Sequence, residues 1–373
     1  MKELQDIIRA SRDLQRNGSP AVLATIVNVH GSTYRRPGAR MLIAQEGRTF
    51  GLISGGCLEG DLFKRAGQVF ASGQTELITY DTRSSDDLVW GFGLGCTGLI
   101  EVLLERIPSP DGTNHLEFLS RCMEGRRACV VSTILNSPPN SGLATGTRVM
   151  LDENGTVELP HMDEALSASI LADCRSVLST GGTRISSYEL RSDQVRVFIE
   201  AVQPPPRLLV FGAGADAIPL IRLAKAIGWT ATVIDNRPAY LKPELFPEAD
   251  AVILADPGTL PEDAALLQGD IAVVMTHNYH HDLAIVRFLL PSPVRYIGLL
   301  GPRSKSVLLM NELASNGCMP TPEQLSRLYA PVGLDIGAET PEEIALAIIS
   351  EMQAASTDRS AGSLRNREGS IHR

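Results

Sequence analysis

A cysteine directly after two glycines is the first place in the chain where chemistry is expected. The segment SGGCLEGDL places Gly55 and Gly56 before Cys57 and acids after it. Paired glycines are typical of backbone that needs a positive φ or that lets another molecule approach closely. The acids and the apolar residues that follow predict a helix start. Cys57 is therefore expected at a strand-to-helix turn, where a thiol can become reactive.

A second cysteine, Cys96, lies in the segment GFGLGCTG, which includes Gly95. Four glycines in eight residues predict a loop whose backbone amides are open to a ligand. A cysteine taken alone is more often a small buried hydrophobe. The glycine-rich context recurs at Cys57 and Cys96, however, and is absent around the other four cysteines. This recurrence favours a ligand site that the two loops share.

Arginines in the segment HGSTYRRPGAR add an anion-binding element. Arginine suits bidentate contacts with phosphate, and the plain alternative is a solvated loop. Our hypothesis places the amides of Gly55, Gly56 and Gly95 around one cavity. Arg36 or Arg40 would then lie at the anionic edge of its ligand.

The segment RLLVFGAGADAIPL predicts a strand, a glycine turn and a helix. Gly212, Gly214 and Ala217 follow the G-x-G-x-x-A spacing that lets a backbone approach a pyrophosphate at a helix N-terminus. Asp235 ends the next predicted strand, where an acid binds ribose hydroxyls. The pattern indicates a Rossmann fold that binds NAD(P), or a Rossmann scaffold that holds another ligand. Asp216 lies inside the turn, where it would repel a pyrophosphate.

Ligands of open parallel sheets bind beyond the carboxyl ends of the strands. Thr276 and His277 follow one predicted strand, so we expect them to line the crevice with Asp235, and we expect Gly301 on its rim. A metal site made of His277, His280, His281 and Asp282 is the alternative. It is not favoured, because H-x-x-H-H after a strand matches no established ligand geometry.

These residues need two domains to hold them. Three consecutive prolines, Pro204–Pro206, cannot lie inside a helix or a central strand and predict the boundary. We expect a mixed α/β domain over residues 1–203, a Rossmann-like domain with a parallel sheet over 204–352 and a disordered polar tail over 353–373. Predicted helices cover residues 1–18, 58–72, 166–178 and 340–355, and predicted strands include 75–81, 98–107, 126–135, 147–159, 194–202, 251–255, 270–276 and 295–301.

Composition limits the possible functions. The chain has 373 residues, a net charge of −9 and no cysteine pair with C-x-x-C spacing. A negative charge argues against non-specific nucleic-acid binding, and no apolar stretch is long enough to span a membrane. The protein is expected in the cytoplasm, where its cysteines stay reduced. Neither a structural zinc site nor a disulfide framework is predicted.

Taken together, the segments resemble the XdhC/CoxI family over nearly the whole chain. The resemblance rests on GSTYRRPGARM, SGGCLEGDL, GFGLGCTG, FGAGADAIPL, THNYHHDL, YIGLLGPRSK and GLDIGAETPEEIALAI, in this order. Members of this family are accessory factors of xanthine dehydrogenase and related molybdenum hydroxylases. The resemblance implies that the chain binds molybdenum cofactor, assists its sulfuration and inserts it into a client enzyme. It also implies a homodimer and a cysteine desulfurase as a further partner.

The resemblance carries over to Cys57, Cys96 and the Gly212–Gly214 turn, and it implies that the thiols of Cys57 and Cys96 contact the molybdenum of the cofactor. Many members have a histidine after the second glycine of this turn, whereas this chain has Ala215 followed by Asp216. No Ser-His-Asp order and no carboxylate pair with a defined role is evident, which favours a cofactor-binding chaperone over an enzyme. An NAD(P)-dependent oxidoreductase and a pure protein-interaction adaptor remain the alternatives.

Overall fold

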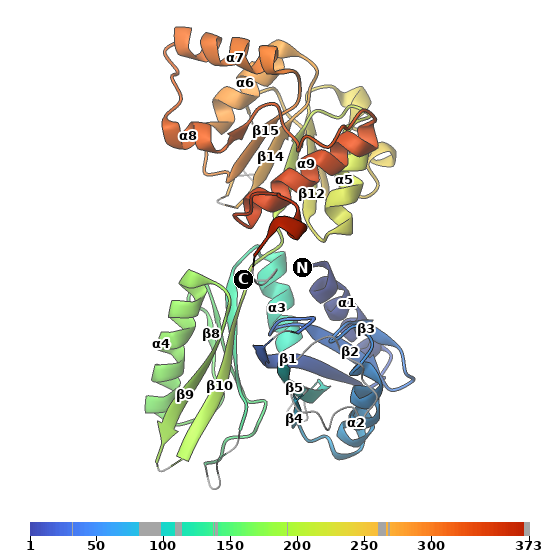
Figure 1. Ribbon diagram of the computed structural model, residues 1–373, viewed down its shortest axis with the longest axis vertical. Coiled ribbons are helices and arrows are strands. Elements are labelled where there is room, and N and C mark those ends of the chain that lie inside the picture. The colour runs from blue at the N-terminus through green and yellow to red at the C-terminus, as the bar shows by residue number, and fades with distance from the viewer. Residues whose placement is uncertain are drawn as a thin grey trace. The chain divides into compact units, whose positions relative to one another are not determined.

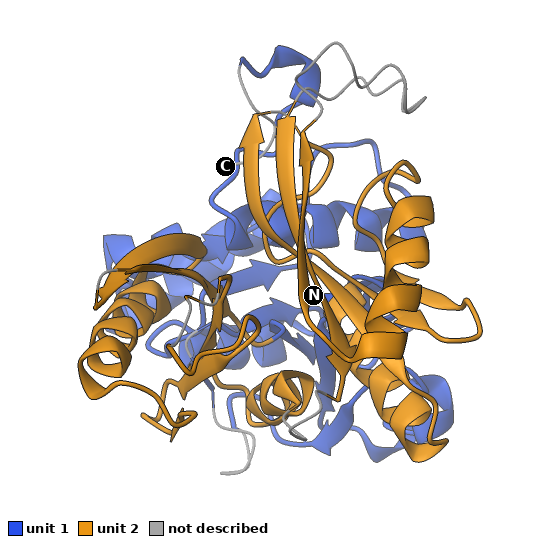
Figure 2. Ribbon diagram, turned by 90° about the horizontal axis from the view of Figure 1, so that it is seen from below, with its two compact units in different colours: residues 1, 205–373 blue, residues 2–204 orange. Residues whose placement is uncertain are grey.

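The computed structural model describes residues 1–31, 33–81, 98–108, 114–136, 138, 141–191, 193–259, 266–267 and 269–368. The chain divides into two compact units, which Figure 2 shows in different colours. The first unit comprises Lys2–Pro204, and the second comprises Pro205–Arg373 together with Met1. The division falls inside the proline run that the sequence places at a boundary.

The first unit contains two antiparallel sheets and four helices among its described residues (Figure 1). Its helices are α1 (Lys2–Arg16), α2 (Glu59–Ser72), α3 (His115–Glu124) and α4 (Glu164–Thr180). Its strands are β1 (Ala21–Gly31), β2 (Arg40–Ala44), β3 (Thr49–Gly51), β4 (Glu76–Asp81), β5 (Gly98–Ile107), β6 (Cys129–Ile134), β7 (Arg148–Asp152), β8 (Val157–Glu158), β9 (Thr183–Leu190) and β10 (Asp193–Val202).

Sheet A has the strand order β3-β2-β1-β5-β4, and both of its faces are covered. Successive side chains of a strand point to opposite faces. Leu23 and Leu42 accordingly pack in one cluster with α1 and α3, whereas Val22 and Ile43 pack in another with α2. Burial on both faces thus explains why β1 and β2 are continuously apolar. The packed strands hold in place the ends from which the loops of this unit leave.

Sheet B has the order β8-β7-β6-β10-β9, and α4 covers one of its faces. Three pairs of oppositely charged side chains join it to sheet A: Arg40 with Glu200, Arg148 with Glu105, and Arg196 with Glu101. Buried charges are costly unless they are paired. The two sheets therefore meet through matched charges as well as through apolar contacts.

The second unit is a parallel sheet with helices on both faces, which confirms the predicted Rossmann-like fold (Figure 1). Its strands are β11 (Arg207–Phe211), β12 (Thr230–Asp235), β13 (Ala251–Leu254), β14 (Ile271–Val274), β15 (Tyr296–Leu299) and β16 (Leu328–Tyr329). Its helices are α5 (Ala217–Ala226), α6 (Tyr279–Leu289), α7 (Arg303–Ser315), α8 (Pro322–Ser326) and α9 (Pro341–Ser356), with short 3-10 turns at Pro238–Tyr240, Pro243–Leu245 and Leu364–Asn366.

The strands lie in the order β13-β12-β11-β14-β15-β16. From β11 the chain first adds strands on one side, β12 and then β13, and afterwards on the other side, beginning with β14. When the six strands are numbered from the start of this unit, the order is 3-2-1-4-5-6. This is the order of doubly wound dinucleotide-binding folds, whose ligands bind beside the first strand. Leu208 and Val210 pack on the face with α5 and α9, and Leu209 and Phe211 pack on the face with α6 and α7. The central strand β11 is thus buried on both faces, as its continuous apolar run predicts.

The structure adds elements that the sequence did not predict. They are α3, α6, α7, α8, β9 and β16. The predicted tail also begins too early, because α9 continues to Ser356 and a 3-10 turn follows at Leu364–Asn366. Gln353, Ala354 and Ala355 are good helix formers, so the helix extends past the buried Met352.

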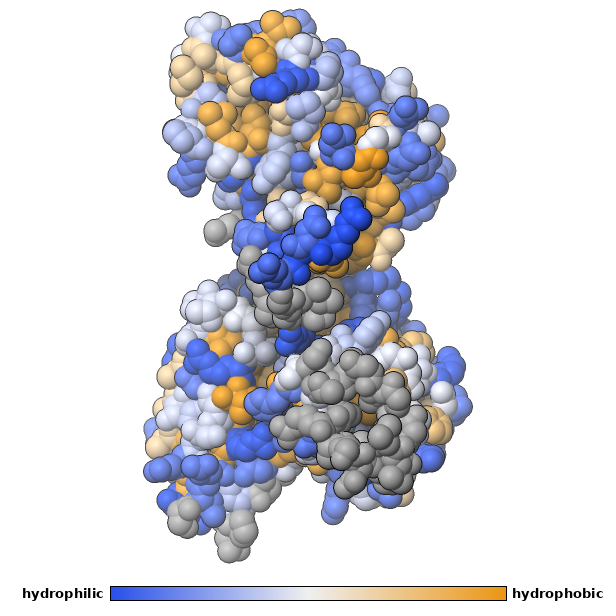
Figure 3. Space-filling model, in the orientation of Figure 1, coloured by the Kyte–Doolittle hydropathy of each residue, from blue (hydrophilic) through white to orange (hydrophobic). Residues whose placement is uncertain are grey.

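The surface drawn in Figure 3 is mostly hydrophilic on both units. On the second unit, hydrophobic residues gather over α9, where Leu346 is exposed. Among the described residues, no helix combines the length and the apolar character needed to cross a membrane.

Candidate functional site

A serine and a glutamate shape the turn that carries Cys57. The Ser54 hydroxyl accepts hydrogen bonds from the N–H groups of Cys57 and Leu58, each at 3.0 Å. The same hydroxyl donates to the Glu59 carboxylate at 2.5 Å, and Glu59 also accepts the Ser54 N–H at 2.7 Å. N–H groups at a helix start have no partner inside the helix. The Ser54 hydroxyl is such a partner for two N–H groups, and Glu59 holds Ser54 in position. Together these hydrogen bonds fix the turn where α2 begins.

This turn presents the thiol of Cys57 at the surface. Ile53 and Leu58 are buried in the core below, while Gly55 and Gly56 are exposed and Cys57 is half-buried with a free thiol. Gly56 has φ +108°, which favours glycine. Among the described residues, nothing lies within 4 Å of a Cβ atom added at Gly55 or Gly56. The backbone beside the thiol is therefore open to a ligand.

The acids after Cys57 are already used by the protein. Burial raises the pKa of Glu59, but hydrogen bonds from the Ser54 hydroxyl and amide outweigh it and lower the pKa. Burial likewise raises the pKa of Asp61, and hydrogen bonds from Tyr80 at 2.7 Å and Arg65 at 2.8 Å lower it overall. Both carboxylates are ionised at neutral pH and hold the first turns of α2 in place.

The strand ends that lead into the three segments singled out in the first unit face the same direction in sheet A. Strand β1 ends at Gly31 opposite Gly98, where β5 begins. Strand β4 ends at Asp81, opposite the second residue of β5, and β3 ends at Gly51 opposite the start of β2. Gly51 pairs with Met41, which lies opposite Ala24 of β1, whereas Gly98 lies opposite Gly31. The two strand ends thus face the same way but stand seven positions apart along β1 (31 − 24), and a shared site stays a prediction. Cys96 and Gly95 themselves lie outside the described residues.

The arginines of the first unit do not act as a group. Arg35 pairs with Glu3 of α1 at 2.6 and 3.0 Å. Arg40 is buried, and its two Nη atoms donate to the Glu200 carboxylate at 3.0 and 2.5 Å. The expected phosphate contact of Arg40 does not fit this geometry, because its guanidinium is enclosed between the two sheets. Arg36, which is half-buried in the loop, is the arginine that we retain as a candidate.

The glycine turn of the second unit is built for close backbone approach. Gly212 has φ +122°, and a Cβ atom there would lie 2.5 Å from the carbonyl oxygen of Met275. Gly214 has room, because an added Cβ would meet only the His277 ring, at 3.8 Å. Of these two positions, Gly212 is therefore the one at which the fold requires glycine, because the chain there passes close to the end of β14.

Asp235 connects β12 to this turn. Its carboxylate accepts the Ala213 N–H at 2.8 Å, between the two glycines, and Arg237 binds it through both Nε and Nη2, at 2.9 and 2.8 Å. Burial raises the pKa of Asp235, but the bonds from Arg237 and from the Ala213 amide outweigh it and lower the pKa. The structure thus brings Gly212, Gly214 and Asp235 together.

His277 lies opposite the glycine turn and contacts an acid there. Its Nε2 atom is 2.8 Å from the Asp216 carboxylate, which stands where α5 begins. His277 has φ +57°, a left-handed conformation in which histidine is found more often than most residues. The strained backbone directs the imidazole toward Asp216.

Thr276 belongs to a buried polar contact beneath the crevice. Asp282 is fully buried and accepts hydrogen bonds from the Thr276 hydroxyl at 2.6 Å and from the Lys305 ammonium group. Gly301 has φ +135°, and a Cβ there would lie 2.9 Å from Lys305 Cδ. Within the part of the chain that the structure describes, no group of three or more His, Cys, Asp or Glu side chains could hold a metal ion.

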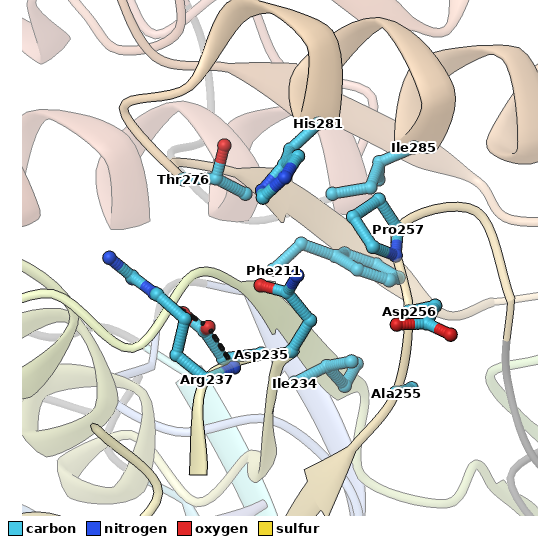
Figure 4. A pocket seen from close by; sticks show the side chains of 11 residues that line it. Phe211, Ile234, Asp235, Arg237, Ala255, Asp256, Pro257, Thr276, His281 and Ile285 are labelled. Carbon is cyan, nitrogen blue, oxygen red and sulfur yellow. Dashed lines mark hydrogen bonds and ion pairs between the residues drawn. The ribbon is translucent and has the colours of Figure 1, made fainter. Parts of the chain in front are cut away.

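A small cavity of about 20 Å³ lies beyond the ends of β11, β12 and β13 (Figure 4). Asp235, Arg237 and Thr276 line it, and Gly301 does not. Figure 4 shows the ion pair of Arg237 and Asp235 on one side and Thr276 with His281 on the other. Space of this size suits about one water molecule.

Sequence reasoning missed three residues that determine these contacts. Arg237 follows Asp235 by two positions, so its ion pair could have been suspected from the segment IDNR. Glu200 is 160 positions from Arg40, and Lys305 is 23 positions from Asp282. No local signal identifies either of these two partners.

Comparison with known proteins gives the class to which these features belong. Residues 208–352 match the family model for the XdhC Rossmann domain, and residues 14–81 match the model for the XdhC and CoxI family. A probable subunit of xanthine dehydrogenase from Bacillus subtilis is 39% identical over 332 residues, which cover 89% of this chain and 92% of that protein. The chain therefore belongs to the XdhC and CoxI family.

Two further proteins are similar over nearly the whole chain. The molybdenum cofactor insertion chaperone PaoD of Escherichia coli is 23% identical over 348 residues, covering 93% of this chain and 86% of PaoD. A crystal structure of a xanthine dehydrogenase from Bacillus halodurans superposes with a TM-score of 0.76 and 31% identity. That match covers 96% of this chain and 98% of the other, so the similarity extends over both units.

Proposed function

We propose that this protein binds molybdenum cofactor, assists its sulfuration and inserts it into a xanthine dehydrogenase-type molybdenum hydroxylase. The observation that carries the proposal is similarity over both units to proteins named for xanthine dehydrogenase and for molybdenum cofactor insertion. Family membership supports the accessory role in general. The contacts between the chain and the cofactor are our own proposal for how the chain performs this role.

The cofactor is cargo in this proposal: a pterin with a phosphate and a dithiolene-bound molybdenum centre. We place the Cys57 thiol against the sulfur-rich end, because soft thiolates suit such metals. The half-exposed thiol and the open backbone at Gly55 and Gly56 support this placement. We further propose that Cys96 and Gly95 contact the same cofactor and that Arg36 contacts its phosphate.

The binding step is tested directly by purifying the full chain from cells that make the cofactor. Molybdenum and pterin are then measured per mole of protein. The proposal predicts both, in near-equal amounts and above the level of an unrelated protein purified in parallel. Protein that carries neither, even when cofactor is supplied during purification, would contradict it.

Transfer requires partners. We propose a molybdenum hydroxylase client, a cysteine desulfurase that supplies sulfur, and a homodimer in the cytoplasm. Sedimentation of the purified chain should give twice the monomer mass of 40.2 kDa. Each partner should be retained on the immobilised full chain, and a client that matures equally well without this protein would contradict the proposal.

An NAD(P)-dependent oxidoreductase is the alternative that the second unit favours. The strand order and the close backbone turn at Gly212 support it. Asp216 at that turn and the occupied carboxylate of Asp235 count against it. Titration of NADH and of molybdenum cofactor into the same protein separates the two functions. Tight NADH binding without cofactor binding would favour the oxidoreductase.

A further inference from the structure

The second unit has two places where a Rossmann fold contacts a dinucleotide: the glycine turn for the pyrophosphate and the acid after the second strand for the ribose. Here both places are taken by side chains of the chain itself. Neither set of contacts is used by the function proposed above. The side chains that occupy them indicate which ligand the crevice accepts.

At the glycine turn, an acid stands where a phosphate would bind. Asp216 is the residue at the start of α5, where helix N–H groups favour a negative charge, and its carboxylate accepts no hydrogen bond from them. His277 contacts that carboxylate at 2.8 Å, and its ring covers Gly214. A pyrophosphate would have to approach a carboxylate and displace the imidazole. The turn therefore selects against anionic ligands.

At the ribose position, the acid is fully occupied. One carboxylate oxygen of Asp235 accepts the N–H and Nε of Arg237, both at 2.9 Å. The other oxygen accepts the Ala213 N–H and Arg237 Nη2, both at 2.8 Å. A carboxylate has about four lone-pair positions. Ribose hydroxyls can therefore reach Asp235 only when the Arg237 side chain moves away.

Arg237 is placed so that it can move. Its side chain is 41% exposed, and its guanidinium lies over the Tyr240 ring at 3.9 Å. Among the described residues, its side chain otherwise contacts this exposed ring, so its departure from Asp235 would leave the apolar core undisturbed. The cavity behind it is too small for a base in the described conformation. Movement of Arg237 would therefore open the crevice and free Asp235 together.

The walls of the cavity suit a flat base. Five of the lining residues are apolar: Phe211, Ile234, Ala255, Pro257 and Ile285. Asn236 and Asp256 also line it, and neither side chain has a hydrogen-bond partner among the described residues. Apolar walls with a few converging polar groups are typical of small-molecule sites. An amide and a carboxylate can pair with the edge of a base that carries an amino group.

We propose that this crevice binds a nucleoside whose 5′ substituent is neutral or cationic. The ribose hydroxyls replace Arg237 on Asp235, and the base enters between the apolar walls. Asp216, held by His277, excludes a phosphate from the glycine turn. The inference concerns the second unit and does not depend on cofactor binding by the first.

Calorimetric titration of the full chain tests the site and its selectivity. The four ribonucleosides serve as probes, and the tightest is compared with its own 5′-diphosphate. Wild-type protein should bind that nucleoside about tenfold or more tightly than the diphosphate, because a carboxylate lies at the phosphate position. The Asp216→Asn variant removes the charge and costs no side-chain cap, because the Asp216 side chain makes no capping hydrogen bond with α5. It should bind the diphosphate about tenfold more tightly than wild type does and the nucleoside within about threefold.

Two more variants complete the test. Arg237→Ala should tighten nucleoside binding about fivefold or more, because Asp235 no longer has to exchange partners. Glu248→Gln removes an exposed acid that pairs with Arg222 outside the crevice, so it should change neither affinity. Failure of every nucleoside to bind both wild type and Arg237→Ala would overturn the proposal. Equal affinity of wild type for the diphosphate, or no gain for it in Asp216→Asn, would overturn the exclusion by Asp216.

Discussion

Gly212 lies against the end of the neighbouring strand, so close that a Cβ atom would be 2.5 Å from the carbonyl oxygen of Met275. The same glycine has φ +122°, which other residues rarely adopt. The glycine turn is therefore a requirement of the fold, whatever ligand the crevice accepts. Gly214, two residues later in the same turn, has neither a positive φ nor a close backbone neighbour.

Gly212→Ala should lower the free energy of unfolding by about 3 kcal/mol or more, because the methyl group clashes with backbone that cannot move aside. Gly214→Ala is the matched control and should change it by about 1 kcal/mol at most, since its methyl group would have ordinary contacts. Urea denaturation of the full chain measures both. If both variants lose the same free energy of unfolding, the close approach of β11 and β14 does not require a glycine at position 212.

The Asp235 contact predicts a pH dependence. Its pKa is lower in the folded protein than in the unfolded chain. Its contribution to stability is therefore complete above the usual aspartate pKa of about 3.9, and it is lost as the pH falls through the lowered value. Asp235→Asn should be less stable than wild type at pH 7 by about 1–3 kcal/mol, and the difference should shrink below about pH 4. A difference that is constant between pH 7 and pH 3 would contradict this account.

The second unit could be predicted from sequence because its signals are local. Continuous apolar runs, the G-x-G-x-x-A spacing, the acid after the second strand and the Thr340–Glu343 capping box each lie within one short segment. The parallel sheet and the closeness of Asp235 to the glycine turn follow from them, whereas the strand order and the contact of Asp235 with Ala213 are given by the structure. The side chains that close the crevice could not be predicted, because His277 and Asp216 meet across 61 positions.

The buried pair of Arg40 and Glu200 should behave as a unit. Arg40→Met leaves Glu200 without its partner between the sheets, which should cost about 3–5 kcal/mol. The double variant Arg40→Met/Glu200→Leu should recover part of that loss, since no unpaired charge stays buried. Arg48→Met, in an exposed pair with Glu46, is the control and should cost at most about 1 kcal/mol. Losses that simply add in the double variant would contradict the pairing.

The first unit was harder to predict for a related reason. Arg40 stands in a loop-like segment, and nothing near it in sequence reveals that Glu200 encloses it. The β9 segment alternates only weakly and gains its place by pairing with β10. The Cys57 turn was predicted correctly as the start of a helix, because its glycines, serine and acids act within six residues.

The turn that holds Cys57 should depend on Ser54. Ser54→Ala removes the acceptor of two N–H groups and the partner of Glu59, and should lower the free energy of unfolding by about 1–2 kcal/mol. Ser72→Ala, at the exposed far end of α2, should change it by about 0.5 kcal/mol or less. If the two variants are equally stable, the serine does not fix the turn.

The proposed role of Cys57 in holding the cofactor is the central claim. Cys57→Ser keeps nearly the same size but gives up most thiolate character at neutral pH. Because the side chain lies in an open turn, the free energy of unfolding should stay within about 0.5 kcal/mol of wild type. Cys318→Ser changes another half-buried free thiol, in the second unit, and is the matched control.

The most direct measurement is the dissociation constant of molybdenum cofactor for wild type, Cys57→Ser and Cys318→Ser, by equilibrium dialysis under anaerobic conditions. We predict that Cys57→Ser binds about tenfold or more weakly while Cys318→Ser binds like wild type. Equal affinity of all three proteins would contradict the thiolate contact and leave Cys57 as a small side chain with no part in holding the cofactor.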